Sequence, residues 1–398
     1  MKKFGLFILL FSLLVLIGCS GKKEDRRIVT PWGEVQTDSL PSTANFTYSD
    51  IVTNGELIML TLSGPETYYD YHGKQMGAQF LLCEKFSQSI GVSLRVEVCK
   101  DTMEMVDRLI KGEADLIAFP MPMDVKGAKQ LKFCGLVVDS LKTGWAVAQS
   151  STDLARILDQ WYQPDMLANI KKEEAYLLSS RSVKRHVYSP FLNRSSGVIS
   201  KYDHLFKKYA PMARWDWRLM AAQCYQESCF DPNARSWAGA RGLMQIMPRT
   251  AAHLGLPMDR IHEPEPNIAA SAKYLQELSV HFKDIQNTTE RQYFVLASYN
   301  GGAAHVRDAM ALTRKNGGNP QLWGDVSRHL LLLSNPLHYQ DPVVKSGYMR
   351  SSETYHYVER IRERYAQYRG VPVGKLSPGN GFSPVIPRKA KRKNKYRV

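Results

Sequence analysis

Cysteine is scarce in this chain, and the few cysteines present are not arranged for metal binding. Six occur among 398 residues. Apart from Cys19 near the N-terminus, they are Cys83, Cys99, Cys134, Cys224 and Cys229. An odd number cannot pair completely, and no two of these residues have the spacing of metal ligands. We expect most of them to be buried as small hydrophobic side chains, and a disulfide between Cys83 and Cys99 stays open as an alternative.

The sequence also lacks the patterns of a cofactor site. His253, His262, His305 and the other histidines form no cluster with metal-ligand spacing, and there is no glycine-rich phosphate-binding loop. No internal repeat is present either. We therefore predict neither a metal nor a cofactor.

A confident membrane-spanning run is missing as well. Lys2 and Lys3 precede the apolar stretch FGLFILLFSLLVLIG, which ends before Cys19 and is too short for a confident span. Residues 16–19, Leu-Ile-Gly-Cys, resemble the bacterial lipobox, in which the cysteine is lipidated and becomes the first residue of the mature chain. The resemblance implies a signal peptide at residues 1–18 and a lipid anchor at Cys19, with an uncleaved anchor helix as the alternative.

The region after the cysteine suits a protein held at a membrane. Ser20 resembles the second residue of lipoproteins that are sorted to the outer membrane. Residues 19–49 are polar, with proline, serine and threonine, and suit a flexible tether. We therefore expect a cell-envelope protein that is lipid-anchored, on the periplasmic side of the outer membrane.

The net charge of +15 favours anionic partners, but the positive charge is unevenly distributed. Seven basic side chains lie in the last eleven residues, RKAKRKNKYRV, so residues 371–398 are predicted to be a disordered basic tail. Nucleic acid is one candidate partner for such a tail, and a cell-envelope polyanion or lipid head group is the other. Because the N-terminus indicates the envelope, we predict no nucleic-acid partner.

Strand and helix patterns alternate after the tether. Strands are predicted at 56–62, 92–98 and 115–119, and helices at 75–90 and 103–110. Strands that alternate with helices predict a parallel α/β sheet.

Parts of this region resemble the periplasmic solute-binding proteins, whose two lobes close on an amino acid. The resemblance rests on Asn54-Gly-Glu-Leu, on Gly77 at a helix start, and on residues 109–115, LIKGEAD. Residues 143–161 resemble the segment in which the chain of these proteins comes back from the second lobe to the first. Because this segment follows Phe133 by only about ten residues, we expect the second lobe to be missing. Residues 50–162 are therefore predicted to be a single truncated lobe, with a regulatory or scaffold role and candidate cell-wall protein partners. A solute receptor is the open alternative.

The rest of the chain has little strand pattern. Residues 163–198 are basic and serine-rich and are predicted to be a linker, and residues 199–370 an all-α domain. Asp216 is a suitable N-cap for a helix that continues to Ser228. Further helices are predicted at 267–278, 291–298 and 353–368.

The glutamate near the end of that helix is a candidate general acid. At helical spacing, Glu227 shares a face with Cys224, Gln223 and Met220, which is mostly apolar. Removal from water disfavours a carboxylate, so the pKa of Glu227 should rise toward the value that a general acid near neutral pH needs. An ion pair with Arg241 is the alternative.

Two further features follow in the sequence. The pair Asp231-Pro232 is expected to stop the helix. Gly239 and Gly242 are expected to let the backbone approach a bulky ligand closely.

Four motifs that follow in order indicate a family. They are Glu227-Ser228, Gly242-Leu-Met-Gln245, Tyr299-Asn300, and Glu353-Thr354 with Tyr357-Val358. The set resembles the lysozyme-like lytic transglycosylases of the soluble-lytic type, and longer matches, such as SWAGARGLMQ at 236–245, resemble the membrane-bound lytic transglycosylase F group. The chain departs from that family at Ser271 and Ser298, where glycine and alanine are common. The implied fold is an α+β multidomain protein with an α/β lobe followed by an all-α lysozyme-like domain.

The resemblance implies cleavage of the β-1,4 bond between N-acetylmuramic acid and N-acetylglucosamine in peptidoglycan glycan strands, with a 1,6-anhydro end as product. It assigns Glu227 as acid and then base. It assigns substrate contacts to Ser228, Met244, Gln245, Tyr299, Asn300 and Tyr357. Trp237 and Tyr225 are candidates for stacking on sugar rings. Asp231 is predicted to hold a turn and Glu353 to form an ion pair.

Two other functions remain open for the helical region. A goose-type lysozyme would hydrolyse the same bond with the same lone glutamate. A non-catalytic wall-binding scaffold would keep the fold without the chemistry.

Overall fold

A computed structural model describes residues 28–30, 33–35 and 47–370. The predicted signal peptide, Cys19, most of the tether and the basic tail lie outside these residues. The chain divides into two compact units, residues 1–45 and 46–398. In the first unit, β1 (Ile28–Thr30) and β2 (Gly33–Val35) pair in antiparallel fashion.

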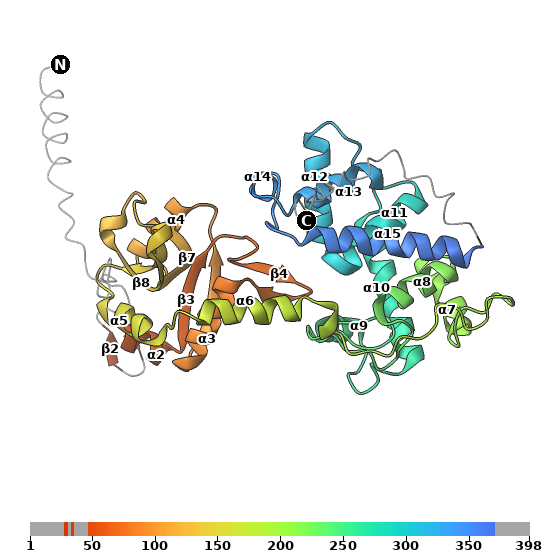
Figure 1. The fold of residues 1–398 in the computed structure, drawn as a ribbon, viewed down its shortest axis with the longest axis horizontal. Coiled ribbons are helices and arrows are strands. Elements are labelled where there is room, and N and C mark those ends of the chain that lie inside the picture. Colours follow the sequence, from red (N-terminus) through yellow and green to blue (C-terminus); the bar gives the residue numbers. More distant parts are fainter. Residues whose placement is uncertain (1–27, 31–32, 36–46, 371–398) are drawn as a thin grey trace, which may run out of the picture. The chain divides into compact units, whose positions relative to one another are not determined.

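The second unit begins with an α/β region (Figure 1). Its elements in chain order are α2 (Tyr48–Asn54), β3 (Glu56–Thr61), β4 (Tyr69–Tyr71), β5 (Lys74–Met76), α3 (Ala78–Ser89), β6 (Ser93–Val98), α4 (Thr102–Ile110), β7 (Leu116–Pro122), η1 (Ala128–Gln130), β8 (Leu131–Val138), η2 (Asp139–Leu141), β9 (Thr143–Ala148), α5 (Thr152–Trp161) and α6 (Met166–Leu177).

Five of these strands form one mixed sheet in the order β6-β3-β7-β9-β8. β3 runs parallel to β6 and β7, whereas β9 is antiparallel to both β7 and β8. The prediction of a parallel sheet is therefore correct for β6, β3 and β7 and wrong for the last two strands. Only the short η2 turn joins β8 to β9, and a connection this short can join only antiparallel strands.

Helices cover both faces of the sheet. On one face α3, α5 and α6 pack over a cluster that includes Phe86, Trp145 and Ile170. On the other face α4 packs over a second cluster, which includes Met105 and Leu109. The segment predicted as a linker thus contains a helix, α6, because its Ile170 is buried in the first cluster.

A two-stranded hairpin, β4–β5, stands apart from the main sheet. Tyr71 pairs with Lys74, so the turn consists of His72 and Gly73, with φ values of 48° and 70°. Two successive left-handed residues are typical of the type I′ turn of hairpins. The predicted helix at 75–90 therefore begins later, at Ala78, because residues 74–76 pair as a strand.

The remainder of the second unit is helical. Its elements are η3 (Ser180–Ser182), α7 (Asp203–Tyr209), η4 (Ala210–Ala213), α8 (Trp217–Ser228), α9 (Pro248–Leu254), α10 (Pro264–His281), α11 (Thr288–Gly301), α12 (Ala303–Lys315), α13 (Trp323–Leu332), α14 (Pro336–Tyr339) and α15 (Ser351–Tyr368). The predicted helices at 267–278 and 291–298 extend by a turn at one or both ends. The predicted helix at 353–368 begins two residues earlier.

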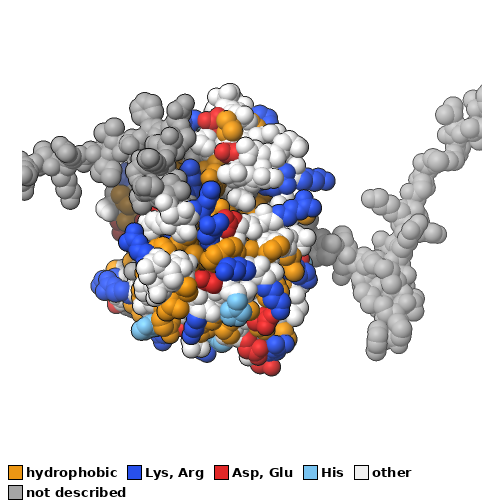
Figure 2. All heavy atoms as spheres, turned by 90° about the vertical axis from the view of Figure 1, so that its right-hand side faces the viewer, with side chains coloured by type: hydrophobic (Ala, Val, Ile, Leu, Met, Phe, Trp, Pro, Cys, Tyr) orange, Lys and Arg blue, Asp and Glu red, His pale blue; other side chains and the backbone are white. Residues whose placement is uncertain are grey.

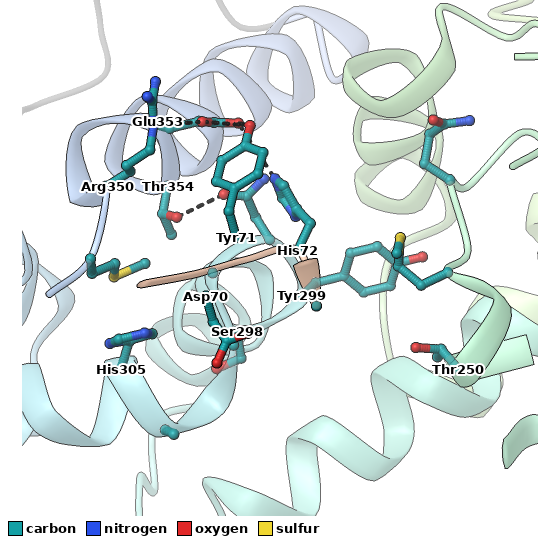
Figure 3. Close-up of a pocket in the computed structure, with 18 of the residues that line it drawn as sticks. Asp70, Tyr71, His72, Thr250, Ser298, Tyr299, His305, Arg350, Glu353 and Thr354 are labelled. Atoms are coloured by element: carbon teal, nitrogen blue, oxygen red, sulfur yellow. Dashed lines mark hydrogen bonds and ion pairs between the residues drawn. The ribbon is translucent and has the colours of Figure 1, made fainter. Parts of the chain in front are cut away.

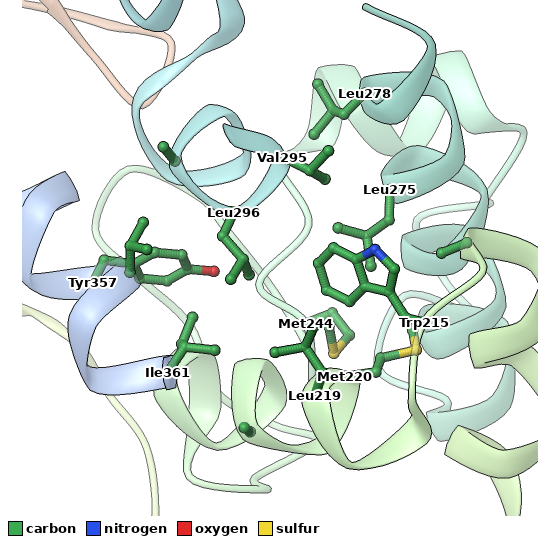
Figure 4. Close-up of a cluster of buried hydrophobic side chains, with 14 of the residues drawn as sticks. Trp215, Leu219, Met220, Met244, Leu275, Leu278, Val295, Leu296, Tyr357 and Ile361 are labelled. Atoms are coloured by element: carbon green, nitrogen blue, oxygen red, sulfur yellow. The ribbon is translucent and has the colours of Figure 1, made fainter. Parts of the chain in front are cut away.

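One large hydrophobic core holds these helices together (Figure 4). Trp215 and Met220 meet Leu275, Val295 and other apolar residues from α10, α11 and α15 inside it. Several side chains of α8, including Leu219 and Met220, are buried in this core, which therefore holds the helix that carries Glu227 in place.

The cysteine prediction is confirmed for the residues after Cys19. All five are buried and none forms a disulfide, so the alternative of a Cys83–Cys99 bridge is wrong. Within the described ranges, no group of three or more His, Cys, Asp or Glu side chains is placed to hold a metal ion.

None of the helices in the described ranges is long and apolar enough to span a membrane. On the face shown in Figure 2, Lys and Arg side chains are interspersed with hydrophobic and acidic ones and form no continuous basic strip.

Candidate active site

Helix α8 begins and ends at residues that place Glu227 at the surface of a cleft. Asp216 caps its start, accepting a hydrogen bond from the backbone N–H of Arg218 at 2.9 Å, as predicted. The helix ends at Ser228, because Cys229 and Phe230 take left-handed backbone angles, with φ of 53° and 63°. The helix therefore ends before it reaches Asp231-Pro232, the pair that was predicted to end it.

The carboxyl of Glu227 is half-buried and has a tyrosine as its hydrogen-bond partner. The Tyr357 hydroxyl on α15 donates to its Oε1 at 2.5 Å, and the buried Gln223 amide donates in turn to the Tyr357 oxygen at 3.2 Å. These bonds form a short chain from the core to the carboxyl group.

Desolvation dominates the electrostatics of this carboxyl and raises the pKa of Glu227 to about 7. The Tyr357 hydrogen bond and the electrostatic influence of the nearby His72 and Arg185 side chains oppose the shift, and the charge of Glu353 adds to it. Glu227 also lies in the last turn of α8, where the negative end of the helix dipole disfavours a carboxylate. The predicted rise of the pKa is confirmed.

The alternative of a Glu227–Arg241 ion pair is not what the structure shows. Arg185 approaches most directly, but its guanidinium donates to the backbone carbonyl of Glu227 at 3.0 Å, not to the carboxyl group. Within the described part of the chain no ion pair with the Glu227 carboxylate is formed. With its pKa raised to about 7, the carboxyl group is protonated in a substantial fraction of molecules at neutral pH, and its side chain is available to a ligand.

Glu227 opens into a cavity of about 420 Å³. The predicted site residues Gln245, Tyr299, Asn300 and Tyr357 line the same cavity, as does the predicted sugar-stacking residue Trp237. A second cavity of about 570 Å³ adjoins it and shares Gln245, Tyr299 and Asn300 as lining residues (Figure 3). Residues from α8, α11, α15 and the loop before α9 are thus brought together.

Hydrogen bonds hold these three of the shared lining residues in place. The Tyr299 hydroxyl donates to the carbonyl of Met244 at 2.7 Å and lies 3.3 Å from the hydroxyl of Ser271, one of the two departures from the family pattern. Asn300 accepts a bond from the Thr354 hydroxyl at 2.7 Å. Gln245 has a left-handed φ of 48°. Its amide donates to two backbone carbonyls, at 2.9 and 3.1 Å.

Two predicted substrate contacts lie away from the cavities. Ser228 is fully buried, and its hydroxyl donates to the carbonyl of Cys224 at 3.2 Å, one turn back along α8. Met244 is fully buried in the hydrophobic core, as Figure 4 shows. The family resemblance suggested them as substrate contacts, but each side chain is buried in the protein interior.

Gly242 has a packing role instead of the predicted role of admitting a ligand, and the same expectation for Gly239 stays a prediction. A Cβ at Gly242, whose φ is +80°, would come within 2.5 Å of the carbonyl of Ile261 and closer still to the side chain of Asn267. Gly242 therefore allows the loop to pack on α10. Gly239 has a φ of +101°, and its nearest neighbour is the ring of Pro248.

The other polar and aromatic candidates have structural partners. Tyr225 packs edge-on against Phe230 and does not line either cavity. Asp231 is buried and accepts backbone hydrogen bonds from His186 at 2.7 Å and from Asn233 at 2.9 Å, as expected of a turn residue.

Sequence reasoning missed the contribution of the β4–β5 hairpin. Its tip residues Tyr71 and His72 line both cavities, together with Arg350 and Glu353 of the α15 region. The cluster of tyrosines before a His-Gly pair was a usable turn signal. No signal in the sequence predicted the contact between Tyr71 and Glu353, which are 282 positions apart.

Comparisons with known proteins identify relatives of this chain. Residues 204–321 match the model of the Transglycosylase SLT domain. The membrane-bound lytic murein transglycosylase F of Salmonella arizonae is 30% identical, and the match covers 79% of this chain and 79% of the relative. The protein of the same name from Klebsiella pneumoniae is 28% identical, over 79% of this chain and 80% of that protein.

Solved structures resemble the two regions separately. The soluble lytic transglycosylase SLT70 of Escherichia coli is 27% identical over 43% of this chain and 25% of that one, with a TM-score of 0.30. The arginine-bound form of domain 1 from TmArgBP is 20% identical over 30% of this chain and 96% of that one, with a TM-score of 0.26. On the sequence identity and coverage of its relatives, the chain belongs to the family of membrane-bound lytic murein transglycosylase F.

Proposed function

We propose that this chain is a peptidoglycan lytic transglycosylase in which Glu227 is the acid–base group. The substrate bond is the β-1,4 link between N-acetylmuramic acid and N-acetylglucosamine. The observation that carries the proposal is the state of the Glu227 carboxyl. It faces a cavity of about 420 Å³, forms no ion pair in the described chain, and has a pKa raised to about 7.

In the first step Glu227 acts as an acid. Its proton passes to the glycosidic oxygen as the bond from that oxygen to C1 of the muramic residue breaks, and the N-acetylglucosamine side leaves as an alcohol. The electron deficiency at C1 is met by the acetamido oxygen of the substrate itself. The Tyr357 hydroxyl, 2.5 Å from Oε1, stabilises the carboxylate that remains.

In the second step the same carboxylate acts as a base. It removes the proton of the C6 hydroxyl as that oxygen attacks C1, which closes the 1,6-anhydro ring and returns Glu227 to its protonated form. No water is consumed, so one carboxyl group is sufficient. Ordinary glycosidases use two, about 5–5.5 Å apart for retention of configuration.

Glu353 also lines the cavity that Glu227 faces, and we assign it no acid–base role. Its two carboxylate oxygens share the hydrogen bond that the Tyr71 hydroxyl donates, and one of them lies 3.5 Å from His72. These partners hold the pKa of Glu353 below its usual value despite its burial, so it stays ionised.

Product analysis tests the reaction type. Purified sacculi are digested with the protein, and the released muropeptides are analysed by mass spectrometry. Anhydromuramic ends are the expected products. Reducing ends alone would show a hydrolase of the goose-lysozyme type, and intact sacculi would show a scaffold without activity.

We further propose that the chain is a lipoprotein, with a signal peptide at 1–18, an acylated Cys19 and a tether at 19–49. The lipobox-like residues, Ser20 and the words "membrane-bound" in the names of the relatives support this proposal. The outer membrane, on its periplasmic side, is the location that these features favour. A Cys19→Ser variant should lose its lipid and leave the membrane fraction, whereas Ser20→Ala should keep both.

The remaining segments are proposed to have supporting roles. Residues 50–162 would act as a scaffold or regulatory lobe that binds cell-wall proteins, residues 163–198 would connect it to the transglycosylase domain at 199–370, and the basic tail at 371–398 would contact anionic envelope polymers. Calorimetry of the full-length protein with free amino acids should show weak binding or none.

A further inference from the structure

Residues 175–202, which lead from the end of α6 to the start of α7, carry positive charge without any acidic residue. They contain five Lys or Arg side chains and no Asp or Glu. A run of like charge is by itself only a solvated surface. What lies beside these charges therefore decides whether the segment binds anything.

Three large apolar side chains extend into solvent from the middle of this segment. Val187 and Leu192 are 64% and 65% exposed, and Tyr188 is 42% exposed. Single exposed apolar residues are ordinary on protein surfaces, but these three lie within six positions of one loop. The loop projects beside α7, on the right-hand side of Figure 1. Figure 2 shows that side of the molecule, where hydrophobic and basic side chains lie next to one another.

The exposure of this loop is built into its backbone. The Leu192 N–H donates to the Ile199 carbonyl at 2.9 Å, which holds the loop in a fixed turn. The ring of Phe191 packs edge-on against Tyr368 of α15, with the ring centres 5.1 Å apart. Leu192 therefore projects from a loop whose neighbouring side chain is packed against the helical domain.

Cationic groups flank the apolar side chains. The Lys201 ammonium lies 5.8 Å from the centre of the Tyr188 ring, and the Arg194 guanidinium lies 5.9 Å from the centre of the Phe191 ring. Among the described residues, no Asp or Glu pairs with either cation. Both charges are therefore available to an anionic partner.

More positive charge begins at the same end of the helical domain. Tyr368, which packs on the loop, is two residues from Gly370, where the described chain ends. Residues 371–398 contain eight Lys or Arg side chains and no Asp or Glu. Their charge adds to that of the loop because they follow directly on the part of α15 that the loop contacts.

Aliphatic side chains flanked by cations fit the surface of an anionic bilayer. Exposed apolar groups enter the boundary between head groups and acyl chains, and tyrosine favours that boundary. Lys and Arg at the same level are attracted to anionic head groups. A sugar polymer would instead be met by aromatic faces and hydrogen-bonding groups, and Val187 and Leu192 offer neither.

We propose that residues 186–194, together with Lys201, are a second membrane contact, through which the helical domain rests on an anionic phospholipid bilayer. The N-terminal anchor keeps this loop at a high effective concentration near the membrane, so a weak contact is sufficient. Two points of attachment give the protein a preferred orientation on the bilayer. The inference does not depend on the proposed reaction.

The test places a fluorophore that senses its environment on the loop. The described cysteines are buried, so a surface cysteine introduced by Leu192→Cys can be labelled selectively. Full-length protein is held by its N-terminal anchor on vesicles of phosphatidylethanolamine and phosphatidylglycerol, or of phosphatidylcholine alone. On the anionic vesicles the emission should shift to the blue and rise about twofold or more, as on entry into the interface.

A second labelling site and a charge reversal serve as controls. Leu337→Cys places the same label on α14, at a residue that is 83% exposed, and its emission should not change. Arg194→Glu/Lys201→Glu should abolish most of the change at residue 192. Lys129→Glu/Arg156→Glu makes the same change of charge on the α/β region and should leave the signal at residue 192 intact.

Four outcomes would overturn the proposal. The first is unchanged emission at residue 192 on the anionic vesicles. The second is an equal change at residue 337, which would mean that the protein lies on the bilayer without a preferred face. The third is a full response after reversal of the two loop charges. The fourth is a response to purified sacculi and none to vesicles, which would assign the surface to a wall polymer.

Discussion

The chemistry proposed for the cleft depends on a proton held by one carboxyl group. The pKa of Glu227 is raised to about 7 because burial outweighs the stabilising bond from Tyr357, so part of the population holds the proton at neutral pH. The residues around it contribute shape and polarity, since Gln245, Tyr299 and Asn300 are each tied to the backbone or to a neighbouring side chain. A ligand that enters the cavity would therefore meet polar side chains that are already held in position beside Glu227.

Replacing that group should abolish activity without unfolding the protein. Glu227→Gln keeps the shape of the side chain and its contact with Tyr357, but the amide has no acidic proton to give to the glycosidic oxygen. General acid–base catalysis contributes roughly 10²–10⁴-fold, and one group here serves both steps, so we expect a loss of kcat at the upper end of that range or beyond. Release of soluble muropeptides from sacculi measures the effect.

A matched surface glutamate provides the control. Glu265 is exposed on α10 and pairs with Lys208, so Glu265→Gln should leave the rate unchanged. Undiminished lysis by a folded Glu227→Gln protein would refute the assigned role of Glu227.

The pH dependence should follow the protonated form of the same residue. Because the pKa of Glu227 is raised to about 7 and the acid form starts the reaction, kcat/KM should fall as pH rises through about 7. The Tyr357 bond favours the carboxylate, so Tyr357→Phe should raise the pKa and move this decline to higher pH. Tyr355→Phe, on the same helix but outside both cavities, should not move it. A decline displaced to lower pH in Tyr357→Phe would contradict the proposed electrostatics.

The bounds of a helix were predictable from the sequence where a capping residue or the spacing of apolar residues defines them. The start of α8 follows from Asp216, whose carboxylate caps the first turn, and its mostly apolar face follows from helical spacing. The start of α3 was not predictable from spacing, because residues 74–76 carry a helical pattern but pair with β4. The end of α8 was missed for a related reason, since Cys229 and Phe230 take left-handed angles that their residue types do not announce.

The loop that presents Gln245 shows how one element positions another. The side chain of Asn267 on α10 accepts a hydrogen bond from the Met244 N–H at 2.8 Å and donates to the Ile261 carbonyl at 2.8 Å. Gly242 leaves the space that Asn267 fills. The loop conformation is therefore determined by α10, which lies outside the motif itself.

Substitution of this glycine should destabilise the protein more than its backbone angle alone predicts. Gly242→Ala adds a Cβ within 2.5 Å of the Ile261 carbonyl, so the loop or α10 must shift. Gly255 has a similar φ, +74° against +80°, with nothing within 4 Å of an added Cβ. Gly255→Ala should cost about 1–2 kcal/mol of unfolding free energy, the expected price of a left-handed alanine, and Gly242→Ala clearly more.

Chemical denaturation of both variants measures the difference. Equal losses of unfolding free energy would show that the contact with Asn267 is unimportant for the loop.

The contacts between the α/β lobe and the helical domain could not have been predicted from sequence patterns. Tyr71 bonds to a residue 282 positions away in the chain. No periodicity, cap or turn signal links such positions. The order of the motifs suffices to indicate a family, but only the folded chain shows that the lobe contributes to the cleft.

A second contact between these regions gives the last prediction. Ser63, just after β3, accepts a hydrogen bond from the backbone N–H of Tyr348 at 2.9 Å, and the Tyr348 ring packs edge-on against Tyr69 of the hairpin. Gly347, with φ of +70°, faces Ser63 so closely that an added Cβ would lie 2.8 Å from the Ser63 Cβ. Gly347→Ala should therefore push Ser63 away and loosen the hairpin.

Hydrogen exchange measures that loosening directly. Amide protons of residues 64–76 should exchange faster in Gly347→Ala than in Gly317→Ala, because Gly317 has φ of +77° and open space around an added Cβ. Removing the obstructing side chain with Ser63→Gly should restore part of the protection in the double variant. Identical exchange of the hairpin in Gly347→Ala and Gly317→Ala would mean that the hairpin is fixed only through the hydrogen bond of Tyr71 to Glu353 and the stacking of Tyr71 on Trp237, independently of the contact at Ser63.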